Sequence, residues 1–475
     1  MAGPAIPASP IGDTVEVSEP QPQGRGTGAA RAAYPESAAY WALFVIVLAT
    51  FMTFFDAVVF GMLAESIKRD FGLTDTQLGF LAGPATIICY FFVGIPLGRL
   101  ADIYPRKFVL AASAAITGVL IGLSGLAQSF GQFIGSRVFL AAGGSAHAPA
   151  SYSLLADAFP PRKLTRAFAL LQFGFIGGTT LGPVLGGQLV KASAGWTQPF
   201  LGLDIYSWQW VMLYLALPSL AAALLFLTVK EPPRLAPAPD AVQIPRDAGY
   251  LRKAITFMGF DAARAIHAGR RVYYPMFAAL ALSATESFGI MFWRVPYLMR
   301  EYGWDAAQIG NVIGTTALIA SLAGLAFGGV FVEWLAKRHK DANVRAAFVC
   351  FCGSTNVIIT ALLIPDPLWS TIAFGCAAFF GIAGAVPQNA AIQRVAPNDM
   401  RGQVTAFYLF MFTFFGAMGS WFIGAVSDLM GGALGSAILL TACTIMPFAA
   451  LLMFRAIGPY REEVERLDRL AGAPA

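Results

Sequence analysis

The chain has 475 residues, of which 57% are hydrophobic and only 12% are charged, and it carries a formal net charge of +5 with a mean hydropathy of +0.64. Soluble domains carry about 25% charged residues, so this composition excludes a globular protein with a water-facing surface. A bilayer-spanning helix needs roughly 20 mostly apolar residues. Several uncharged runs reach that length, 108–127 and 432–454 among them. The composition therefore predicts a polytopic membrane protein.

The order of apolar and polar stretches predicts an all-α protein with twelve transmembrane helices. Residues 1–38 are rich in Pro, Gly and Ala and have no signal-peptide pattern, which indicates a disordered N-terminal tail. The apolar segments are 39–64, 77–97, 107–128, 130–158, 165–190, 209–229, 273–299, 306–332, 345–364, 368–395, 403–427 and 432–456. They form two predicted six-helix halves, 39–229 and 273–457, followed by a C-terminal tail, 458–475.

A polar linker, 230–272, joins the two predicted halves. Within it, residues 250–258 have helical periodicity with a basic face. This pattern is typical of an amphipathic helix on a membrane surface, and equally of a solvated connector.

The chain contains one unit written twice. A glycine-acid-base pattern between the second and third apolar segments returns 231 residues later, and the stretch 72–79 returns at 303–310. The first copy is Gly98-x3-Asp102-x3-Arg106-Lys107, and the second is Gly329-x3-Glu333-x3-Lys337-Arg338. A repeat of this length predicts two related half-bundles rather than a solenoid.

The placement of Lys and Arg predicts the orientation. With the N-terminus inside, the cytoplasmic segments hold 26 of the 32 basic residues, the outward connections hold four and the spans hold two. Cytoplasmic loops carry the excess of basic residues, so both termini are expected in the cytoplasm and the protein in the inner membrane. The net charge then reflects topology, and no nucleic-acid partner is expected.

Several chemistries find no support in the sequence. The five cysteines lie within apolar runs without a CxxC pair, and the three histidines are scattered, so no metal site is predicted. A membrane-embedded enzyme would need a nucleophile with its base or a metal cluster, and no GxSxG or paired-His motif occurs. The absence of a GxxxxGK[ST] loop excludes an ATP-driven pump for this chain alone.

The twelve spans, the central loop, the repeat and the charged loop at 98–107 together resemble the major facilitator superfamily over residues 39–457. Three stretches resemble its spinster-like branch, namely Phe55-Asp56 with Leu63-Ala-Glu65-Ser-Ile67, Gly94-Ile-Pro96-Leu-Gly98-Arg-Leu-Ala-Asp102, and Asp157-Ala-Phe-Pro160-Pro161-Arg162. The resemblance implies a monomeric transporter that works by alternating access. Its substrate would bind between the two halves, and a proton gradient, without any cofactor, would supply the energy.

The repeated charged loop is expected to form a cytoplasmic gate. Gly98 and Gly329 would let helices approach closely. Asp102 and Glu333 can each stabilise a helix N-terminus. Alternatively, they can pair with Arg106 and Lys337, respectively, and so lock this face, to which Lys107 adds a further basic charge. The alternative is a charged loop that only fixes topology.

Two charges inside the first half form the central hypothesis. A charge at the bilayer centre costs at least about 2.5–3.5 kcal/mol, so each is a functional candidate. Asp56 lies in the first span and Arg137 in the fourth, where the two can neutralise each other. Protonation of Asp56 would free Arg137 for an anionic substrate. The alternative is a static structural ion pair.

One position departs from the spinster-like pattern. Relatives of that branch usually carry a Glu seven residues after the Arg, and here that position is Gly144. His147, one turn further along, titrates near neutrality when unperturbed. It can replace the missing acid as proton carrier or substrate contact, or it is a simple hydrogen-bonded histidine.

The second half offers further polar groups within its spans. Glu286 is expected to line the cavity at a depth similar to Asp56, and Arg294 either faces the cavity or reaches the interface. Gln388 and Asn389, beside Pro387, would contact substrate or bind neighbouring helices.

The fifth span carries Gly178, Gly182, Pro183, Gly186 and Gly187. Such a run favours a bent helix that contacts a neighbour across the interface, a pattern associated with antiporters of this superfamily. The aromatic clusters and Arg137 favour a small amphipathic organic anion, either lipid-like or an aromatic acid. The alternatives are a sugar carrier, a drug/H⁺ antiporter, or a non-transporting receptor on the same scaffold.

Overall fold

The computed structural model of the chain describes residues 34–90, 93, 104–200, 202–234, 260–396 and 401–470. These residues are almost entirely helical and form no named strand. The first group of helices is α2 (Glu36–Phe71), α3 (Asp75–Ala82), α5 (Arg106–Gly125), α6 (Phe130–Gly144), α7 (His147–Ala158), α8 (Pro161–Ala192) and α9 (Ser207–Thr228). The second is α11 (Phe260–Ala268), α12 (Arg270–Tyr302), α13 (Ala306–Ala336), α14 (Ala342–Leu363), α15 (Pro367–Val395), α16 (Arg401–Leu429) and α17 (Leu434–Leu470).

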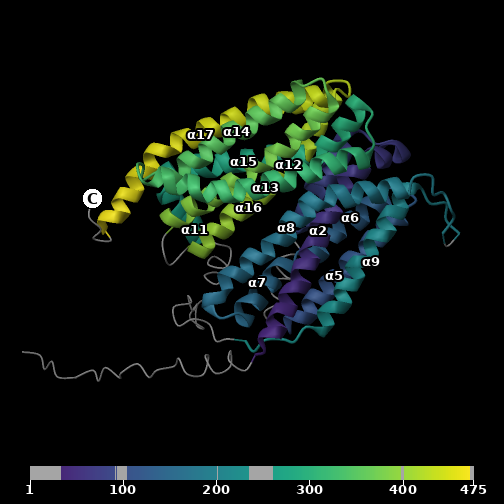
Figure 1. The fold of residues 1–475 in the computed structure, drawn as a ribbon, viewed down its shortest axis with the longest axis horizontal. Helices are drawn as coiled ribbons and strands as arrows, with labels where there is room; N and C mark the ends of the chain where they lie inside the picture. Colours follow the sequence, from purple (N-terminus) through teal and green to yellow (C-terminus); the bar gives the residue numbers. More distant parts are fainter. Residues whose placement is uncertain are drawn as a thin grey trace, which may run out of the picture.

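The helices from α2 to α9 and from α11 to α17 form two halves that lie side by side (Figure 1). The start of α2 and the end of α17 lie at the same end of the molecule, which we call the tail end. The halves approach each other at the opposite end, called the distal end, and diverge toward the tail end.

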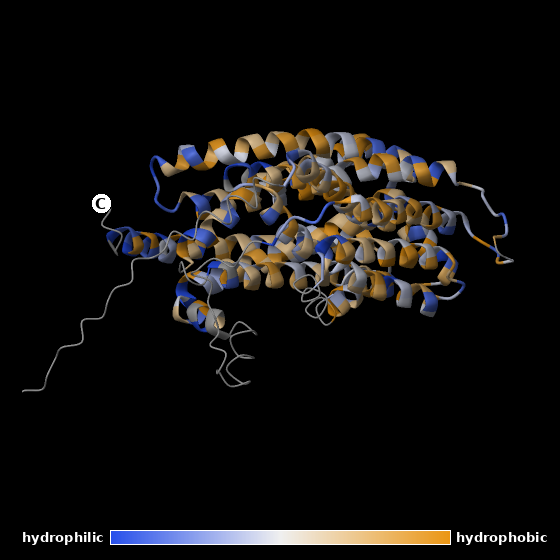
Figure 2. Ribbon diagram, turned by 90° about the horizontal axis from the view of Figure 1, so that it is seen from below, coloured by the Kyte–Doolittle hydropathy of each residue, from blue (hydrophilic) through white to orange (hydrophobic). Residues whose placement is uncertain are grey.

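Length and hydropathy confirm the predicted all-α polytopic fold. Ten of the described helices are long and apolar enough to cross a membrane. Hydrophilic residues gather near the ends of the long helices, whose middles are mainly hydrophobic (Figure 2). Large apolar side chains are exposed on the outside, such as Ile319 at 70% and Leu224 at 68%. Lipid chains, rather than water, are the solvent that such a surface requires.

Two predicted spans are not single helices, and proline explains both breaks. The predicted span 130–158 is divided into α6 and α7 at Ser145 and Ala146, because Pro149 has no N–H for the carbonyl of Ser145. In the predicted span 77–97, α3 ends at Ala82 and helix resumes at Pro84, where a first-turn proline is tolerated. Residues 91, 92 and 94–97 of that span lie outside the described residues.

Two further boundaries differ from the predicted ones. The last helix, α17, continues past the predicted span end at 456 to Leu470, so most of the predicted tail is helical. Arg461 and Arg466 form ion pairs along this extension, with Asp341 and Glu463 respectively. The amphipathic stretch 250–258 lies outside the described residues, and α11 follows it.

The repeated stretches 72–79 and 303–310 build the same turn in each half. Gly72 and Gly303 end α2 and α12 in the left-handed region, with φ of 64° and 66°. Only glycine adopts this conformation at little cost. The next helices, α3 and α13, each begin with a capping box, Thr74 with Gln77 and Asp305 with Gln308. Sequence repetition here reflects a shared tight connection between consecutive spans.

Glycine contacts bring the halves together at the distal end. A Cβ at Gly83 of α3 would lie 1.8 Å from the carbonyl oxygen of Ala417 in α16. A Cβ at Gly310 of α13 would lie 2.0 Å from the carbonyl oxygen of Pro183 in α8. Side chains at these positions are excluded, so the α3–α16 and α8–α13 crossings depend on glycine.

Candidate transport site and its closing contacts

The predicted charge pair of the first half is formed. Nη1 of Arg137 in α6 lies 2.8 Å from Oδ2 of Asp56 in α2. The two residues are 4% and 6% exposed, respectively. The guanidinium also lies 4.5 Å from the ring centroid of Phe60, and its Nη2 contacts the sulfur of Met212 at 3.2 Å. The pair is therefore buried among aromatic and sulfur groups of the same half.

This ion pair is incompletely satisfied. Oδ1 of Asp56 and Nε of Arg137 are buried and have no hydrogen-bond partner in the described part of the chain. Buried polar atoms without partners are costly, and a native protein usually retains them for a function. The pair therefore retains one free acceptor, to which a proton can bind, and one free donor, which an anion can accept.

An aromatic contact links the pair to the other half. The Phe60 ring, which lies under Arg137, has its centroid 5.6 Å from that of Phe292 in α12. A movement of α12 relative to α2 would therefore alter the surroundings of the ion pair directly.

His147 lies close to α2. It begins α7, directly after the break in the predicted fourth span. Its Nε2 is 3.4 Å from the hydroxyl of Thr50, and its ring packs edge-on against Phe226 of α9. Gly144 and His147 line one small cavity inside the first half.

Glu286 differs from its expected place. It is completely buried in α12, at 0% exposure, and neither of its carboxylate oxygens has a hydrogen-bond partner among the described residues. The expectation that it lines an open cavity is therefore wrong for this conformation. Glu286 has no arginine equivalent to Arg137 in its half, because α15 carries no basic residue before Arg394.

The other predicted polar groups of the second half have ordinary contacts or none. Arg294 is half-buried, and its Nε has no partner in the described residues. Asn389 is exposed and donates to the carbonyl of Ala385 in its own helix. Gln388 lies near Gly384, beside α14. Among the described residues, no hydrogen bond or ion pair joins Arg294, Gln388 or Asn389 to Asp56 or Glu286.

The glycines of α8 divide between two neighbours. Gly178 and Gly186 face α2 of the same half, where a Cβ would come within 2.6 Å of Phe54 and Val59, respectively. Gly182 also faces α2, in ordinary contact with Phe55 and Val58. Gly187 and the Pro183 carbonyl face α13 of the other half. The predicted close approach across the interface therefore occurs along the face of α8 that carries Thr180, Pro183 and Gly187.

In the predicted gate at the tail end, Arg106 has other ion-pair partners than the expected one. Gly98 and Asp102 lie outside the described residues. Arg106 is 2% exposed, and its guanidinium pairs with Asp157 of α7 and with Glu231, at 2.8 Å, after α9. Glu231 also accepts hydrogen bonds from the backbone N–H groups of Arg106 and Lys107. These contacts stay within the first half.

The second copy of the gate pattern is not an ion pair. Glu333 and Lys337 are exposed at the end of α13, and neither takes part in a salt bridge within the described ranges. Gly329 has no atom within 4 Å of an added Cβ, so it makes no close helix contact. Exposed charges at a helix end are well solvated and gain little from pairing.

A buried charge of opposite sign occupies the corresponding place in the second half. Asp341 directly precedes α14, as Arg106 begins α5, and it is 0% exposed. It pairs at 2.7 Å with Arg345 of α14 and at 2.7 Å with Arg461 of α17. Each half thus ties the start of its third span to the end of its sixth through a buried charge, a cation in the first half and an anion in the second.

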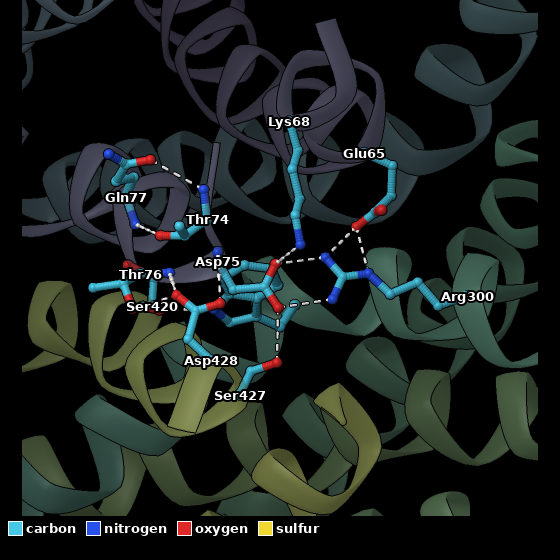
Figure 3. Close-up of polar contacts among 11 residues, drawn as sticks. Glu65, Lys68, Thr74, Asp75, Thr76, Gln77, Arg300, Ser420, Ser427 and Asp428 are labelled. Atoms are coloured by element: carbon cyan, nitrogen blue, oxygen red, sulfur yellow. Dashed lines mark hydrogen bonds and ion pairs between the residues drawn. The ribbon is translucent and has the colours of Figure 1, made fainter. Parts of the chain in front are cut away.

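A polar network closes the distal end, and sequence reasoning missed it (Figure 3). The carboxylate of Asp75 in α3 is fully buried and accepts hydrogen bonds from Arg300, at 2.7 and 2.8 Å, and from Ser427, at 2.7 Å. Lys68 also pairs with it, and Arg300 pairs in addition with Glu65. Asp75 belongs to the first half and Arg300 to the second, so this network joins the halves.

A second carboxylate extends the network. Asp428 of α16 accepts hydrogen bonds from the backbone N–H groups of Asp75 and Thr76, at 3.1 and 2.8 Å, and from the Thr76 hydroxyl at 2.6 Å. It therefore caps the N-terminus of a helix in the other half, where a negative charge is favourable.

The network also fixes the charge of Asp75. Burial alone would raise the pKa of Asp75, but hydrogen bonds from Arg300, Lys68 and Ser427 outweigh it and lower the pKa to about 2. Asp75 is therefore ionised at every physiological pH in this conformation.

The described residues contain no group of three His, Cys, Asp or Glu side chains that could hold a metal ion. The five cysteines are free. The candidate site is therefore built from ion pairs and aromatic groups.

Comparison with known proteins identifies the fold and its relatives. The family model described as "Major Facilitator Superfamily" matches residues 46–420. An "MFS-type efflux pump" of Mycolicibacterium smegmatis is 25% identical over 435 residues, which cover 90% of this chain and 94% of that protein. A "Gallate transporter" of Pseudomonas putida is 25% identical over 444 residues, with the same two coverages.

A solved structure shares the whole fold. It is a crystal structure of a bacterial homologue of the human lysosomal transporter spinster, in an inward-facing and unoccupied conformation. It superimposes with a TM-score of 0.73 at 22% sequence identity and covers 93% of this chain and 99% of its own. The predicted resemblance to the superfamily and its spinster-like branch is confirmed.

Proposed function

The chain belongs to the major facilitator superfamily, whose members are transporters rather than enzymes, and we propose that it is a proton-coupled transporter of small amphipathic organic anions. The observation that carries this proposal is the buried Asp56–Arg137 pair, with one free acceptor and one free donor. The pair lies in a fold that transports by alternating access.

Proton and anion compete for the same pair in this mechanism. While Asp56 is ionised, it neutralises Arg137 and leaves no net charge for a substrate. When a proton binds Asp56, Arg137 becomes an unpaired buried cation, and an anionic substrate then relieves its desolvation cost. Binding of the proton and binding of the anion are thereby linked. A ligand that relieves this cost in only one conformation shifts the equilibrium between conformations.

With a cytoplasmic tail end, the conformation described here would be the inward-facing one. The halves meet at the distal end through Asp75, Arg300 and Asp428 and diverge toward the tail end. The distribution of Lys and Arg favours a cytoplasmic tail end, in the inner membrane. The closed distal end would then face outward. Opening it requires rupture of the Asp75–Arg300 contact and separation of the glycine crossings.

The chemistry of the site favours a carboxylate with an apolar or aromatic body. Arg137 offers the cation, and Phe60 and Phe133 lie within 4.5 and 5.7 Å of its guanidinium. Gallate, which the Pseudomonas relative is named for, is an aromatic carboxylate of this kind. The chain is expected to work as a monomer, with the lipid bilayer as its surroundings and no cofactor besides the proton gradient.

A drug/H⁺ antiporter is the second candidate. The Mycolicibacterium relative is named as an efflux pump, and α8 carries the glycine-proline run associated with antiporters. A sugar carrier fits the site less well, because sugars do not require a buried cation. A receptor without transport activity is also a weaker candidate. The Asp75–Arg300 contact between the halves can break and re-form during a transport cycle, and a receptor has no need of such a contact.

Transport by reconstituted protein tests the proposal. Proteoliposomes would be loaded with gallate, or with other aromatic and long-chain carboxylates, under an imposed pH gradient. We expect the gradient to accelerate net transport by wild type. Asp56→Asn, which keeps the size of the side chain, should lose this acceleration and retain exchange of substrate at equal concentrations.

Asp204→Asn is the matched control, because Asp204 is an exposed acid in the connection before α9. It should behave like wild type. An equal response of wild type and Asp56→Asn to the gradient would contradict the coupling scheme. Movement of cationic drugs instead of carboxylates would favour the antiporter.

A further inference from the structure

A water-sized cavity lies inside the first half, on the tail side of the Asp56–Arg137 pair. Its volume is about 20 Å³, enough for one water molecule. Residues of α2, α5, α6, α7 and α9 line it, namely Ala49, Met52, Thr53, Ser113, Ala114, Thr117, Gly144, His147, Ser219 and Ala222. Ser113 and Ser219 are 5% exposed, whereas Thr53 is exposed and marks the mouth.

The hydroxyl groups of this cavity are arranged as acceptors. The hydroxyl of Ser113 donates to the carbonyl of Gly143 at 2.7 Å, and that of Thr53 donates to Ala49 at 3.0 Å. Ser219 donates to Leu215 at 3.5 Å. Since each hydroxyl has one proton and two lone pairs, these groups retain acceptor capacity toward a guest. A compact hydrogen-bond donor fits this lining, whereas an organic anion is too large and would find few donors.

The cavity adjoins the ion pair along two helices. Met52 and Thr53 lie one helical turn from Asp56 on α2, and Gly144 lies two turns from Arg137 on α6. Oδ1 of Asp56 is buried and unpartnered within the described residues. A donor held in the cavity therefore lies about one helical turn along α2 from an acceptor that lacks a partner.

His147 is the titratable group among the residues that line the cavity. Thr50 of α2 is 3.4 Å from its Nε2, and Phe226 of α9 covers its ring. Around Asp56, the charged neighbour is Arg137 of α6, and α9 contributes the uncharged Met212. The lining therefore combines an imidazole, whose ring nitrogens can accept and donate a proton, with hydroxyls that hold water.

We infer that this cavity is a proton-entry site, in which one bound water carries a proton between His147 and Asp56, apart from the position of the organic anion. The imidazole accepts a proton from the solvent and gives it to the water. The water gives a proton to Oδ1 of Asp56, which breaks the ion pair with Arg137, and the reverse order releases the proton. This inference rests on the proposed proton coupling.

The test needs no transported substrate. Purified protein in lipid would be followed by infrared spectroscopy after a pH jump, and the carboxyl signal that Asp56→Asn removes would be assigned to Asp56. Gly144→Leu fills the cavity, and it can be accommodated because an added Cβ at Gly144 meets no atom within 4 Å. Gly131→Leu, on the same helix and with equally open surroundings, is the control.

We expect Gly144→Leu and His147→Gln to slow the Asp56 signal by about tenfold or more, as removal of a proton-transfer group does. Gly131→Leu should leave its rate unchanged. Ser219→Ala, which removes an acceptor and adds no bulk, should also slow it, so that the test remains decisive if Gly144→Leu fails to fold.

Equal rates in all variants would overturn the inference, because protons would then reach Asp56 by another route. It would also be overturned if a sodium step at constant pH produced the Asp56 signal, since the cavity would then take a metal cation. Absence of any Asp56 titration would contradict the inference and the coupling scheme together. A normal Asp56 signal without gallate transport would contradict only the proposed substrate.

Discussion

The Asp75 carboxylate lies between Lys68 of its own half and Arg300 of the other, 2.7 Å from the Arg300 guanidinium and completely buried. This side chain therefore joins the two halves at the distal end, together with Asp428 and the glycine crossings. Several consequences for the conformational equilibrium can be measured.

Arg300→Gln should shift the protein toward the conformation that is open at the distal end. Removal of one partner from a buried pair costs about 3 kcal/mol, or roughly a hundredfold in the equilibrium between the conformations. Spin labels at the exposed Arg69 and Leu429 positions would report a longer distance in the variant. Unchanged distances would show that the glycine crossings alone keep this end closed.

The distal closure should not respond to pH in the physiological range. The pKa of Asp75, about 2, lies below its ordinary value of 3.8. The stabilisation by ionised Asp75 is therefore present above pH 4 and is lost as the pH falls toward 2. The same spin-label distances at pH 5 and pH 8 should therefore agree in Asp56→Asn. A pH-dependent distance in that variant would place the proton sensor at the distal end.

Gly83→Leu should prevent the distal end from closing. A Cβ at this position would lie 1.8 Å from a backbone oxygen of α16, which cannot move away as a flexible side chain can. Labelling of distal positions by a membrane-impermeant thiol reagent should increase. Gly381→Leu is the control, because an added Cβ there meets no atom within 4 Å, and it should label like wild type.

Arg106→Lys should destabilise the first half. The Arg106 guanidinium contacts Asp157, Glu231 and Ser153 at once, and a lysine ammonium cannot reproduce this fork. We expect the free energy of unfolding to fall by about 2–4 kcal/mol, because a buried cation and two half-buried acids lose part of their pairing. A lower unfolding temperature of the solubilised protein would show it. Arg466→Lys, at an exposed pair, should have little effect.

The features of this structure that could be predicted from the sequence are residues that differ clearly in type from their neighbours along the chain. Asp56 and Arg137 stand out because they are charged within apolar runs, and the cost of such charges predicts that they pair. The repeated stretches 72–79 and 303–310 likewise predict equivalent structure, since a glycine and a capping box have a local meaning.

The distal network was not predictable by the same reasoning. Asp75 and Arg300 lie at helix ends, where charges are ordinary and usually face water. Asp75 and Arg300 are more than 200 residues apart in the sequence, and they form an ion pair only because the two halves meet at this end in one conformation. The only local signal was the excess of charge around 65–75 in an otherwise apolar region.

The burial of Glu286 could not be predicted from the sequence, for a different reason. The face of α12 on which Glu286 lies depends on helix rotation and on packing against α16 and α17. A pattern without a clear polar stripe does not determine that rotation. The breaks at Pro84 and Pro149, by contrast, were within reach of sequence reasoning, because each proline removes a specific backbone hydrogen bond.

The opposite signs of the buried charges at Arg106 and Asp341 bear on how a duplicated chain assembles correctly. Two similar halves made in one chain can exchange helices during insertion, which is a common source of misfolding in repeated proteins. If the last helix of the second half packed on the start of α5, Arg461 would face Arg106. If the end of α9 packed on α14, Glu231 would face Asp341. Like charges would meet in both mispaired forms, so the two buried charges disfavour an exchange of the closing helices.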